Sequence, residues 1–363
     1  MKLPFRFLFA VLCAAMIAFL PFFLSSPTVL YEAQTEMTDE EEDDGETLDF
    51  GRLLFAPAMA EDAADSHFSM EETDVEDPLT MPAKLSIPES WVLPLDFSIP
   101  PQPDPDHFTA DGYEDASIRV RIEEREMMDS VVHAAYVEIA DGSQLRTATA
   151  YGAWNRSIYV ENMAKSNNAV IAMNGDDFIE MPDKKRFEVR MTQKVPQRNK
   201  TSKVKDTLII DRNGDFHLFI LSEGLADYTK EHGGEIVNAF MFGPALVVDG
   251  EVLRLDRKYD YNRTGRDPRS AIGQTGPLSY VMVVVEGRSS KSRGVTHEEL
   301  AEIMLELGCV QAYNLDGGNT AEMIMIGPDG REQFHFKGDQ TASLRSQSDI
   351  IYFATAVPAE EQN

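Results

Sequence analysis

The sequence is poor in cysteine and in positive charge. It has 2 cysteines among 363 residues, Cys13 inside an apolar run and Cys309 far from it, so neither a disulfide framework nor a cysteine-based zinc site can be built. Lys and Arg number 33 against 62 Asp and Glu, which gives a net charge of −29. Because phosphate backbones and anionic lipids attract basic surfaces, this balance excludes a simple nucleic-acid binder and argues against docking on lipid through surface charge.

Several catalytic motifs are also missing. The sequence contains no Walker loop, no GxGxxG fingerprint and no GxSxG nucleophile elbow. Its 7 histidines show no HExxH motif and no close pair at metal-ligand spacing. We therefore expect no cofactor and no catalytic metal. The acidic residues leave room for a structural calcium ion, but no spacing specifies one.

The negative charge lies mostly in the N-terminal third of the chain. Residues 1–115 hold 4 basic and 25 acidic side chains, a balance of −21, whereas residues 116–363 hold 29 and 37, a balance of −8. Eight prolines recur over Pro78–Pro105. High charge with little apolar surface predicts disorder, and dense proline predicts an extended spacer. We predict an acidic, then proline-rich, disordered tether over 31–115 and one folded domain over 116–358.

The N-terminus contains an apolar segment of membrane-spanning length. Phe7 to Leu24 carries no charge and follows Lys2 and Arg6, and about 20 apolar residues are needed to cross a bilayer. No small-residue cleavage site follows closely, so we favour an uncleaved transmembrane signal anchor over 1–30, with secretion as the alternative if the segment is cleaved. Basic residues before the span and acidic ones after it predict a folded domain on the extracytoplasmic side.

The pattern after residue 116 is that of many strands. Residues Ile118–Ile122 alternate apolar and charged side chains as a half-buried strand does. Hairpin-type turns are expected at Asn213-Gly214, Asp249-Gly250 and Asp329-Gly330. Further strands are expected over residues 131–140, 169–173, 207–211, 215–220, 245–248, 251–254, 280–285, 312–315, 321–326 and 350–354.

One helix is strongly indicated after Thr296. Glu299 completes a capping box, an apolar stripe runs from Leu300 to Leu307, and Gly308 is a stop signal. A second helix is expected over 224–233. The predicted fold class is α+β, a single domain with a mixed, largely antiparallel β-sheet and few helices. Because the helix at 296–308 lies between two strands, we expect a local parallel crossover there.

Two polar clusters directly follow apolar strands, where side chains leave the core and can meet a ligand. The first is Asn174-Gly175-Asp176-Asp177, which places two carboxylates after a tight Asn-Gly turn. The second is Asn314-Leu315-Asp316-Gly317-Gly318-Asn319, a polar string that is costly to bury without hydrogen bonds. Each cluster also fits a simpler interpretation, an ordinary turn with solvated acids.

Two further clusters contain arginine. Asp267-Pro268-Arg269-Ser270 leads into small and apolar residues, which suggests a partly buried guanidinium that suits a carboxylate or a phosphate. Glu286-Gly287-Arg288 directly follows an apolar strand, so a carboxylate and a guanidinium are expected side by side where that strand leaves the core. A structural ion pair at Arg269 and a solvated loop at 286–288 are the alternatives.

In these clusters the sequence resembles the phosphodiester glycosidase family, which includes N-acetylglucosamine-1-phosphodiester α-N-acetylglucosaminidase and bacterial exopolysaccharide-associated proteins. The likeness covers roughly residues 117–356 and ends in a tail, 345–353, similar to the family's closing segment. The matching segments occur in the family's order: Asn-Gly-x-x-Phe at 174–178, Phe242–Glu251, Pro268–Gly273, Val283–Arg288, Ser292–Ala301 and Tyr313–Thr320.

The resemblance implies cleavage of the bond between a sugar and a phosphodiester, with a glycan or sugar phosphate as substrate. It implies acid/base or nucleophilic work by Asp316 with Asp177 or Glu286, and phosphate binding by Arg269 and Arg288. Further substrate contacts are expected from the remaining cluster residues: Asn174, Gly175, Asp176, Asn314, Gly317, Gly318 and Asn319.

The sequence departs from the family's pattern at three places. Glu286 stands where Asp is usual, and Ser270 replaces the common Thr. Residues 184–205 hold nine basic residues and one acid, Glu188, which predicts a loop that either attracts an anionic polymer or is merely solvated. The opposing class of function is a membrane-tethered, non-catalytic glycan binder or assembly factor in exopolysaccharide or cell-wall biogenesis.

Overall fold

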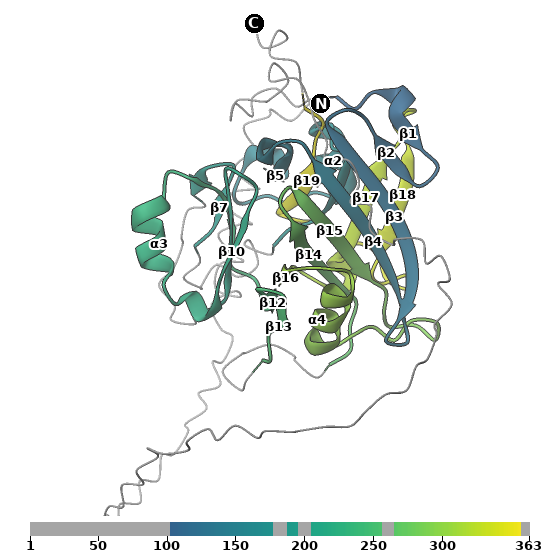
Figure 1. The fold of residues 1–363 in the computed structure, drawn as a ribbon. Coiled ribbons are helices and arrows are strands. Elements are labelled where there is room, and N and C mark those ends of the chain that lie inside the picture. Colours follow the sequence, from purple (N-terminus) through teal and green to yellow (C-terminus); the bar gives the residue numbers. More distant parts are fainter. Residues whose placement is uncertain (1–101, 177–186, 195–204, 256–264, 357–363) are drawn as a thin grey trace, which may run out of the picture. The chain divides into compact units, whose positions relative to one another are not determined.

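The computed structural model describes residues 102–176, 187–194, 205–255 and 265–356 (Figure 1). The predicted signal anchor, nearly all of the predicted tether and Asp177 lie outside these ranges, as do residues 184–186 and 195–204 of the basic segment. Among the described residues, no helix is both long and apolar enough to cross a membrane.

Strands of the described ranges form three sheets, here named A, B and C. The nine strands of sheet A, in spatial order, are β1 (Phe108–Thr109), β2 (Gly112–Glu114), β3 (Ile118–Met127), β4 (Ser130–Ile139), β15 (Ser279–Val285), β14 (Arg269–Gly276), β16 (Gln311–Asn314), β12 (Ala245–Val248) and β13 (Glu251–Val252). The five strands of sheet B are β18 (Glu332–Lys337), β17 (Glu322–Ile326), β6 (Ile171–Asn174), β19 (Asp349–Phe353) and β5 (Leu145–Thr149). The five strands of sheet C are β10 (Phe216–Phe219), β9 (Thr207–Asp211), β11 (Ile236–Phe240), β7 (Val189–Arg190) and β8 (Gln193–Lys194).

The strand ladders within these ranges are antiparallel, which confirms the largely antiparallel character expected. The expectation of a single sheet is wrong, because the strands divide over three. The crossover is confirmed: β15 and β16 both pair antiparallel with β14, so they run in the same direction, and the helix joins them.

The division into sheets follows from how the strands bury both faces. In β4, Ala135 and Val137 enter one core cluster while Val132 and Ala134 enter another, as alternation along a strand requires. The first cluster also contains Met173 of sheet B and residues of sheet C, so it fills the space between sheets. The central strands of sheet A, β4, β15 and β14, are therefore largely buried on both faces, and one sheet alone could not cover their apolar residues.

Three helices cover the outer faces in the described part of the chain. Helix α4 (His297–Glu306) has the predicted capping box of Thr296 and Glu299 and packs on β12, β13 and β16 (Figure 1). Helix α3 (Leu225–His232) was expected, and α2 (Val160–Ser166), which packs on β17 and β19, was not. Helix α2 spans 7 residues and has no side-chain cap, so its helical conformation depends on packing.

The described residues also form five short 3-10 turns: η3 (Pro105–His107), η4 (Gly142–Gln144), η5 (Ala150–Gly152), η6 (Ile220–Ser222) and η7 (Gly318–Thr320).

The sheets begin earlier and contain more strands than the sequence predicts. Strands β1 and β2 fall within residues assigned above to the tether, and Tyr113 of β2 is fully buried with its hydroxyl donating to Asp115 at 2.9 Å. Strands β5, β7, β8, β11, β14 and β18 were also not expected. The three predicted turns do connect hairpins: β9 to β10, β12 to β13 and β17 to β18.

Candidate active site

The four polar clusters meet at adjoining strand ends of sheets A and B. In sheet A, Arg269 pairs with Val285 and Ala271 with Asn314, so the start of β14 lies beside the ends of β15 and β16. In sheet B, β6 ends at Asn174, next to the segment that follows β16. Segments separated by more than a hundred residues in sequence thus supply one site.

Asp316 has its main chain fixed by three neighbours. Its carbonyl oxygen accepts from Asn174 Nδ2 at 2.8 Å and from Ser270 Oγ at 2.5 Å, and its N–H donates to the Gly175 carbonyl at 3.3 Å. The half-buried carboxylate accepts from the Gly317 N–H through Oδ1 at 2.9 Å. A carboxylate held in this way has a defined position before any ligand binds.

The Gly317-Gly318 turn lies between two arginines. A Cβ on Gly317 would come within 2.8 Å of the Pro268 carbonyl oxygen and 3.8 Å of Arg269 Cδ. Gly318 has a φ of +70°, and its Cβ would lie 3.2 Å from Arg288 Nη2. Both positions therefore need glycine, which lets the two arginine side chains approach the main chain after Asp316.

Arg288 is held by acidic and amide side chains. Its Nε and Nη2 donate to the two carboxylate oxygens of Asp267 at 2.7 and 3.1 Å, and Nη1 donates to Asp339 Oδ2 and Asn319 Oδ1 at 3.0 Å each. The hydrogen bond with Asp267 is the main cause that raises the pKa of Arg288. The sequence predicts phosphate binding by Arg288 and a substrate contact by Asn319. In the structure these two side chains bind each other and fix the turn.

Arg269 is buried and donates to main-chain carbonyls. Its Nε donates to the Val295 carbonyl at 3.2 Å and Nη2 to the Gly265 carbonyl at 3.0 Å. Burial lowers the pKa of Arg269; the charge of Asp267 opposes this shift, and the nearby charge of Arg288 adds to it. Burial and the charge of Arg269 together lower the pKa of His297 to about 3, so this imidazole is neutral near pH 7. A negative ligand would relieve the repulsion between the two arginines.

Glu286 makes a dyad with a histidine. Its Oε1 lies 2.9 Å from His133 Nε2 and accepts from Gln340 Nε2 at 3.0 Å. The His133 ring stacks on Phe336 with centroids 4.2 Å apart. The Glu286 side chain is 15% exposed, so it is partly reachable from solvent.

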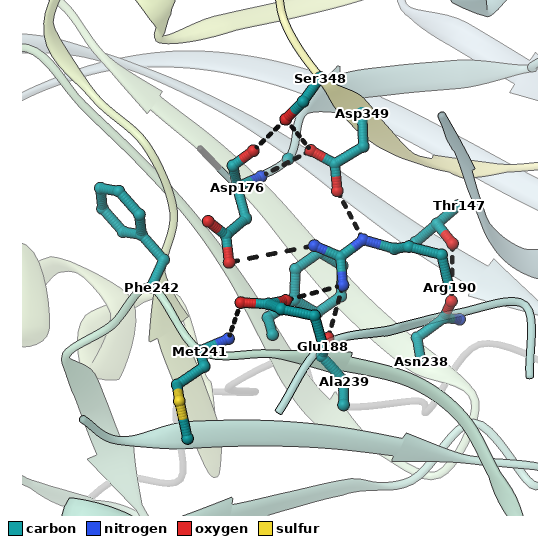
Figure 2. Close-up of polar contacts among 12 residues, drawn as sticks. Thr147, Asp176, Glu188, Arg190, Asn238, Ala239, Met241, Phe242, Ser348 and Asp349 are labelled. Atoms are coloured by element: carbon teal, nitrogen blue, oxygen red, sulfur yellow. Dashed lines mark hydrogen bonds and ion pairs between the residues drawn. The ribbon is translucent and has the colours of Figure 1, made fainter. Parts of the chain in front are cut away.

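Asp176 belongs to a buried ionic cluster, shown in Figure 2. Arg190 lies at its centre, with Nε 2.5 Å from Asp349 Oδ2, Nη1 3.0 Å from Glu188 Oε2 and Nη2 3.9 Å from Asp176 Oδ2. Each of these four side chains is at most 2% exposed. We predicted a substrate contact for Asp176, but in the structure its carboxylate is buried and points into this cluster.

The cluster combines three carboxylates with one guanidinium. Burial raises the pKa of Asp349 to about 6, although Arg190 opposes the shift. Burial would lower the pKa of Arg190, but the charges of Asp349, Glu188 and Asp176 outweigh it and raise this pKa. The Arg190 guanidinium also lies 3.9 Å from the centroid of the Phe240 ring. Residues 188–190 of the basic segment are thus core, and the prediction of a loop over 184–205 is wrong there.

Asn174 and Asn314 bind main-chain groups. Asn314 Nδ2 donates to the Gly243 carbonyl at 2.9 Å, and Asn174 Oδ1 accepts the Glu322 N–H at 3.0 Å. Both are at most 1% exposed. Glu322 in turn contacts His335, with Oε1 2.7 Å from Nε2. Against the lowering effect of burial, hydrogen bonds with Glu322 and Glu332 raise the pKa of His335.

Sequence reasoning missed several residues of this region. Arg190 was assigned to a basic segment, Asp349 lies one residue before an expected strand, and Asp339 follows a strand that was not expected. A single acid inside the basic segment, Glu188, was the available signal, because an isolated opposite charge between basic residues suggests pairing. Within the described ranges, no group of three or more His, Cys, Asp or Glu side chains is arranged to hold a metal ion.

Comparisons with known proteins agree with the motifs at this site. The profile of the phosphodiester glycosidase family matches residues 167–354, which include all four clusters. The SPbeta prophage-derived uncharacterized protein YomE of Bacillus subtilis (strain 168) is 26% identical over 184 residues, 50% of this chain and 28% of that protein. The chain thus spans less than a third of that relative's length.

A solved structure shows the same fold. The catalytic domain of zebrafish N-acetylglucosamine-1-phosphodiester alpha-N-acetylglucosaminidase, auto-inhibited by its pro-peptide, has a TM-score of 0.51 and 17% identity over 68% of this chain and 87% of that one. A hypothetical protein from Synechocystis has a TM-score of 0.45 and 13% identity over 66% and 62%. With the family profile covering more than half of its residues, the chain belongs to the phosphodiester glycosidase family.

Proposed function

We propose that this protein is a membrane-anchored, extracytoplasmic hydrolase that cleaves the glycosidic C–O bond of a sugar phosphodiester in a surface glycan or glycopolymer. The observation that carries the proposal is the placement of Asp316 beside a glycine turn flanked by Arg269 and Arg288. The chemistry needs a carboxylate near the sugar and a cation near the phosphate. Family membership supports the same reaction class.

The reaction requires a water molecule and a group that receives its proton. Water adds to the anomeric carbon, its proton passes to a carboxylate, and the bond to the phosphate oxygen breaks with its electron pair on that oxygen. The products are the free sugar and a phosphomonoester. We assign the carboxylate role to Asp316, whose position is fixed by Asn174, Ser270 and Gly175. Glu286, paired with His133, is the second candidate.

We assign the phosphate contact to Arg269 rather than to Arg288. Arg269 lies against the glycine turn that follows Asp316, because a Cβ on Gly317 would come within 3.8 Å of its Cδ. Arg288 is bound by the carboxylates of Asp267 and Asp339. Arg288 then serves to hold the glycine turn in place. A phosphomonoester is a good leaving group and needs little protonation, so an arginine that stabilises its negative charge suffices.

The location is proposed from the sequence alone. The apolar segment from Phe7 to Leu24 would anchor the chain, and residues 31–101, which precede the described part of the domain, would separate the hydrolase domain from the bilayer. Protease treatment of intact cells that express the full-length chain tests this proposal. Digestion of the domain outside, with a membrane-retained N-terminal fragment, supports it, and protection of the domain overturns it.

The activity is tested with the full-length chain and the methyl phosphodiester of N-acetylglucosamine 1-phosphate, by following the free sugar with proton NMR. We expect sugar release by the wild type and none by Asp316→Asn. Asp329→Asn is the matched control, because Asp329 lies in the β17–β18 turn and its side chain is 61% exposed. Full activity of Asp316→Asn would remove Asp316 from the mechanism. Binding of glycan by the wild type without any release would support the non-catalytic alternative.

A further inference from the structure

A groove of about 500 Å³ lies beside strand β5, apart from the Asp316 turn. Its lining comes from β5, the turn after it, helix α2 and the β7–β8 hairpin. Arg190 lines the groove and is also the centre of the ionic cluster that holds Asp176. The groove therefore adjoins the candidate active site through this cluster.

Aromatic side chains contribute to the lining of the groove. Tyr151 and Trp154 both line it, and Tyr151 is 69% exposed. Tyr151 has a φ of +57°, a left-handed conformation that a bulky residue seldom adopts. Because the Tyr151 side chain is largely in solvent, core packing does not explain why the residue adopts this conformation. Residues held in such conformations cluster at ligand sites.

The remaining lining mixes polar, uncharged side chains with apolar ones, the latter being Ala148, Ile158, Met163 and Met191. Asn162 and Asn167 come from α2, Gln193 from β8 and Thr149 from β5, and no Asp or Glu is among the described lining residues. Amide and hydroxyl groups can both donate and accept hydrogen bonds, as sugar hydroxyls require. Aromatic rings provide a flat apolar surface for the C–H face of a sugar ring. The combination favours a neutral saccharide over a cationic or strongly anionic ligand.

We infer that the groove lined by Tyr151 and Trp154 is a second saccharide-binding site, which takes neutral sugar units of a glycan. The biological role of this site rests on the proposed function: binding of a polymeric substrate at a distance from the cleaved bond would keep that substrate at the enzyme. The binding itself does not depend on catalysis. The volume of the groove, the exposure of Tyr151 and the chemistry of the lining carry the inference independently of Asp316.

The test is a binding titration of the full-length chain, followed by tryptophan fluorescence. The chain has 2 tryptophans, Trp91 and Trp154, so a Trp91→Phe background reports on the groove. The probes are an N-acetylglucosamine tetramer and a glucose tetramer. We expect a saturable change in Trp154 emission with at least one probe. No saturable change with either tetramer overturns the inference.

Matched variants locate the binding. Tyr151→Asn removes the ring and keeps a residue type that tolerates positive φ, and it should weaken binding about tenfold or more, which is at least roughly 1.4 kcal/mol. Tyr159→Ala removes an aromatic side chain that is 49% exposed but does not line the groove, and it should bind as the wild type does. Equal affinity in wild type and Tyr151→Asn would overturn the inference.

The same titration separates this inference from the proposed function. Asp316→Asn should bind the tetramer as tightly as the wild type while releasing no sugar. A wild-type protein that binds but never releases sugar would defeat the proposed hydrolase and leave the groove assignment intact. Sugar release without tetramer binding would overturn the groove assignment and leave the proposed hydrolase intact.

Discussion

Arg190 Nε lies 2.5 Å from Asp349 Oδ2, with both side chains almost completely buried. This ion pair joins β7 of sheet C to β19 of sheet B. Asp349 also accepts the Asp176 N–H through Oδ1 at 3.0 Å, and its carbonyl accepts the Gly175 N–H at 3.1 Å. The buried pair of Arg190 and Asp349 therefore links sheets B and C. The same Asp349 also holds the main chain of Gly175, whose carbonyl binds the Asp316 N–H.

Removal of the guanidinium should strongly destabilise the protein. Arg190→Met leaves the carboxylates of Asp176, Glu188 and Asp349 buried without their cation, and breaking a buried pair in this way costs about 3–5 kcal/mol. Urea denaturation of the full-length chain measures the loss. The control is Arg293→Met, which breaks an exposed pair with Asp129 and should change stability by less than about 1 kcal/mol. Similar losses in the two variants would contradict the cluster's role.

Asp349 should give the stability a specific pH dependence. Its pKa is raised from 3.8 to about 6 in the folded state, mainly by burial, so the folded protein binds a proton more readily than the unfolded chain. The contribution of this group is therefore most favourable below about pH 4 and is lost as the pH rises towards 6. Relative to Asp349→Asn, the wild type should lose unfolding free energy over this window. Parallel stability curves from pH 4 to 7 would show that Asp349 does not titrate there.

A methyl group at Gly318 should disturb the site as well as the fold. Gly318→Ala forces an L-residue into a φ of +70° and places Cβ 3.2 Å from Arg288 Nη2, so we expect about 1–2 kcal/mol of destabilisation and at least a tenfold loss of sugar release. Gly330→Ala is the matched control, because Gly330 has a φ of +75° with no atom near its Cβ position. It should lose similar stability and keep full activity. Equal activity of the two variants would argue against a role for the Arg288 contact.

Substitution of Arg269 should act on phosphate binding. Arg269→Lys retains the charge but loses the planar fork, which is not equivalent for binding phosphate. We expect the KM for the methyl phosphodiester to rise about tenfold, and inhibition by inorganic phosphate to weaken in parallel. Arg331→Lys, at a side chain that is 86% exposed, is the control. An unchanged KM and an unchanged phosphate inhibition in Arg269→Lys would remove Arg269 from the phosphate site.

The strands and turns that could be predicted are those with strong local patterns. Strands β9 and β12 match the expected ranges residue for residue, because each is a short apolar run that ends near an Asn-Gly or Asp-Gly turn. The capping box at Thr296 predicted the start of α4 for the same reason. These features depend on neighbours in sequence, so local reasoning finds them.

Strand β14 could not be recognised in this way. Its sequence, Arg269 to Gly276, contains two glycines and an alanine, which are depleted in strands. It forms a strand because it lies between β15 and β16 and pairs with both. Gly273 is needed there because a Cβ would clash with the buried Cys309 Sγ. That contact joins residues far apart in the chain.

The sequence by itself determined the family, the largely antiparallel α+β character and the four clusters that carry polar chemistry, because these depend on residue types and short spacings. Only the tertiary structure decided which polar groups of these clusters are buried. It placed Asp316 on a fixed turn, turned Asp176 inward to Arg190, and bound Arg288 to Asp267 and Asp339. Those outcomes depend on which charges meet across sheets, and the cost of burying a charge is set by partners that the local sequence does not contain.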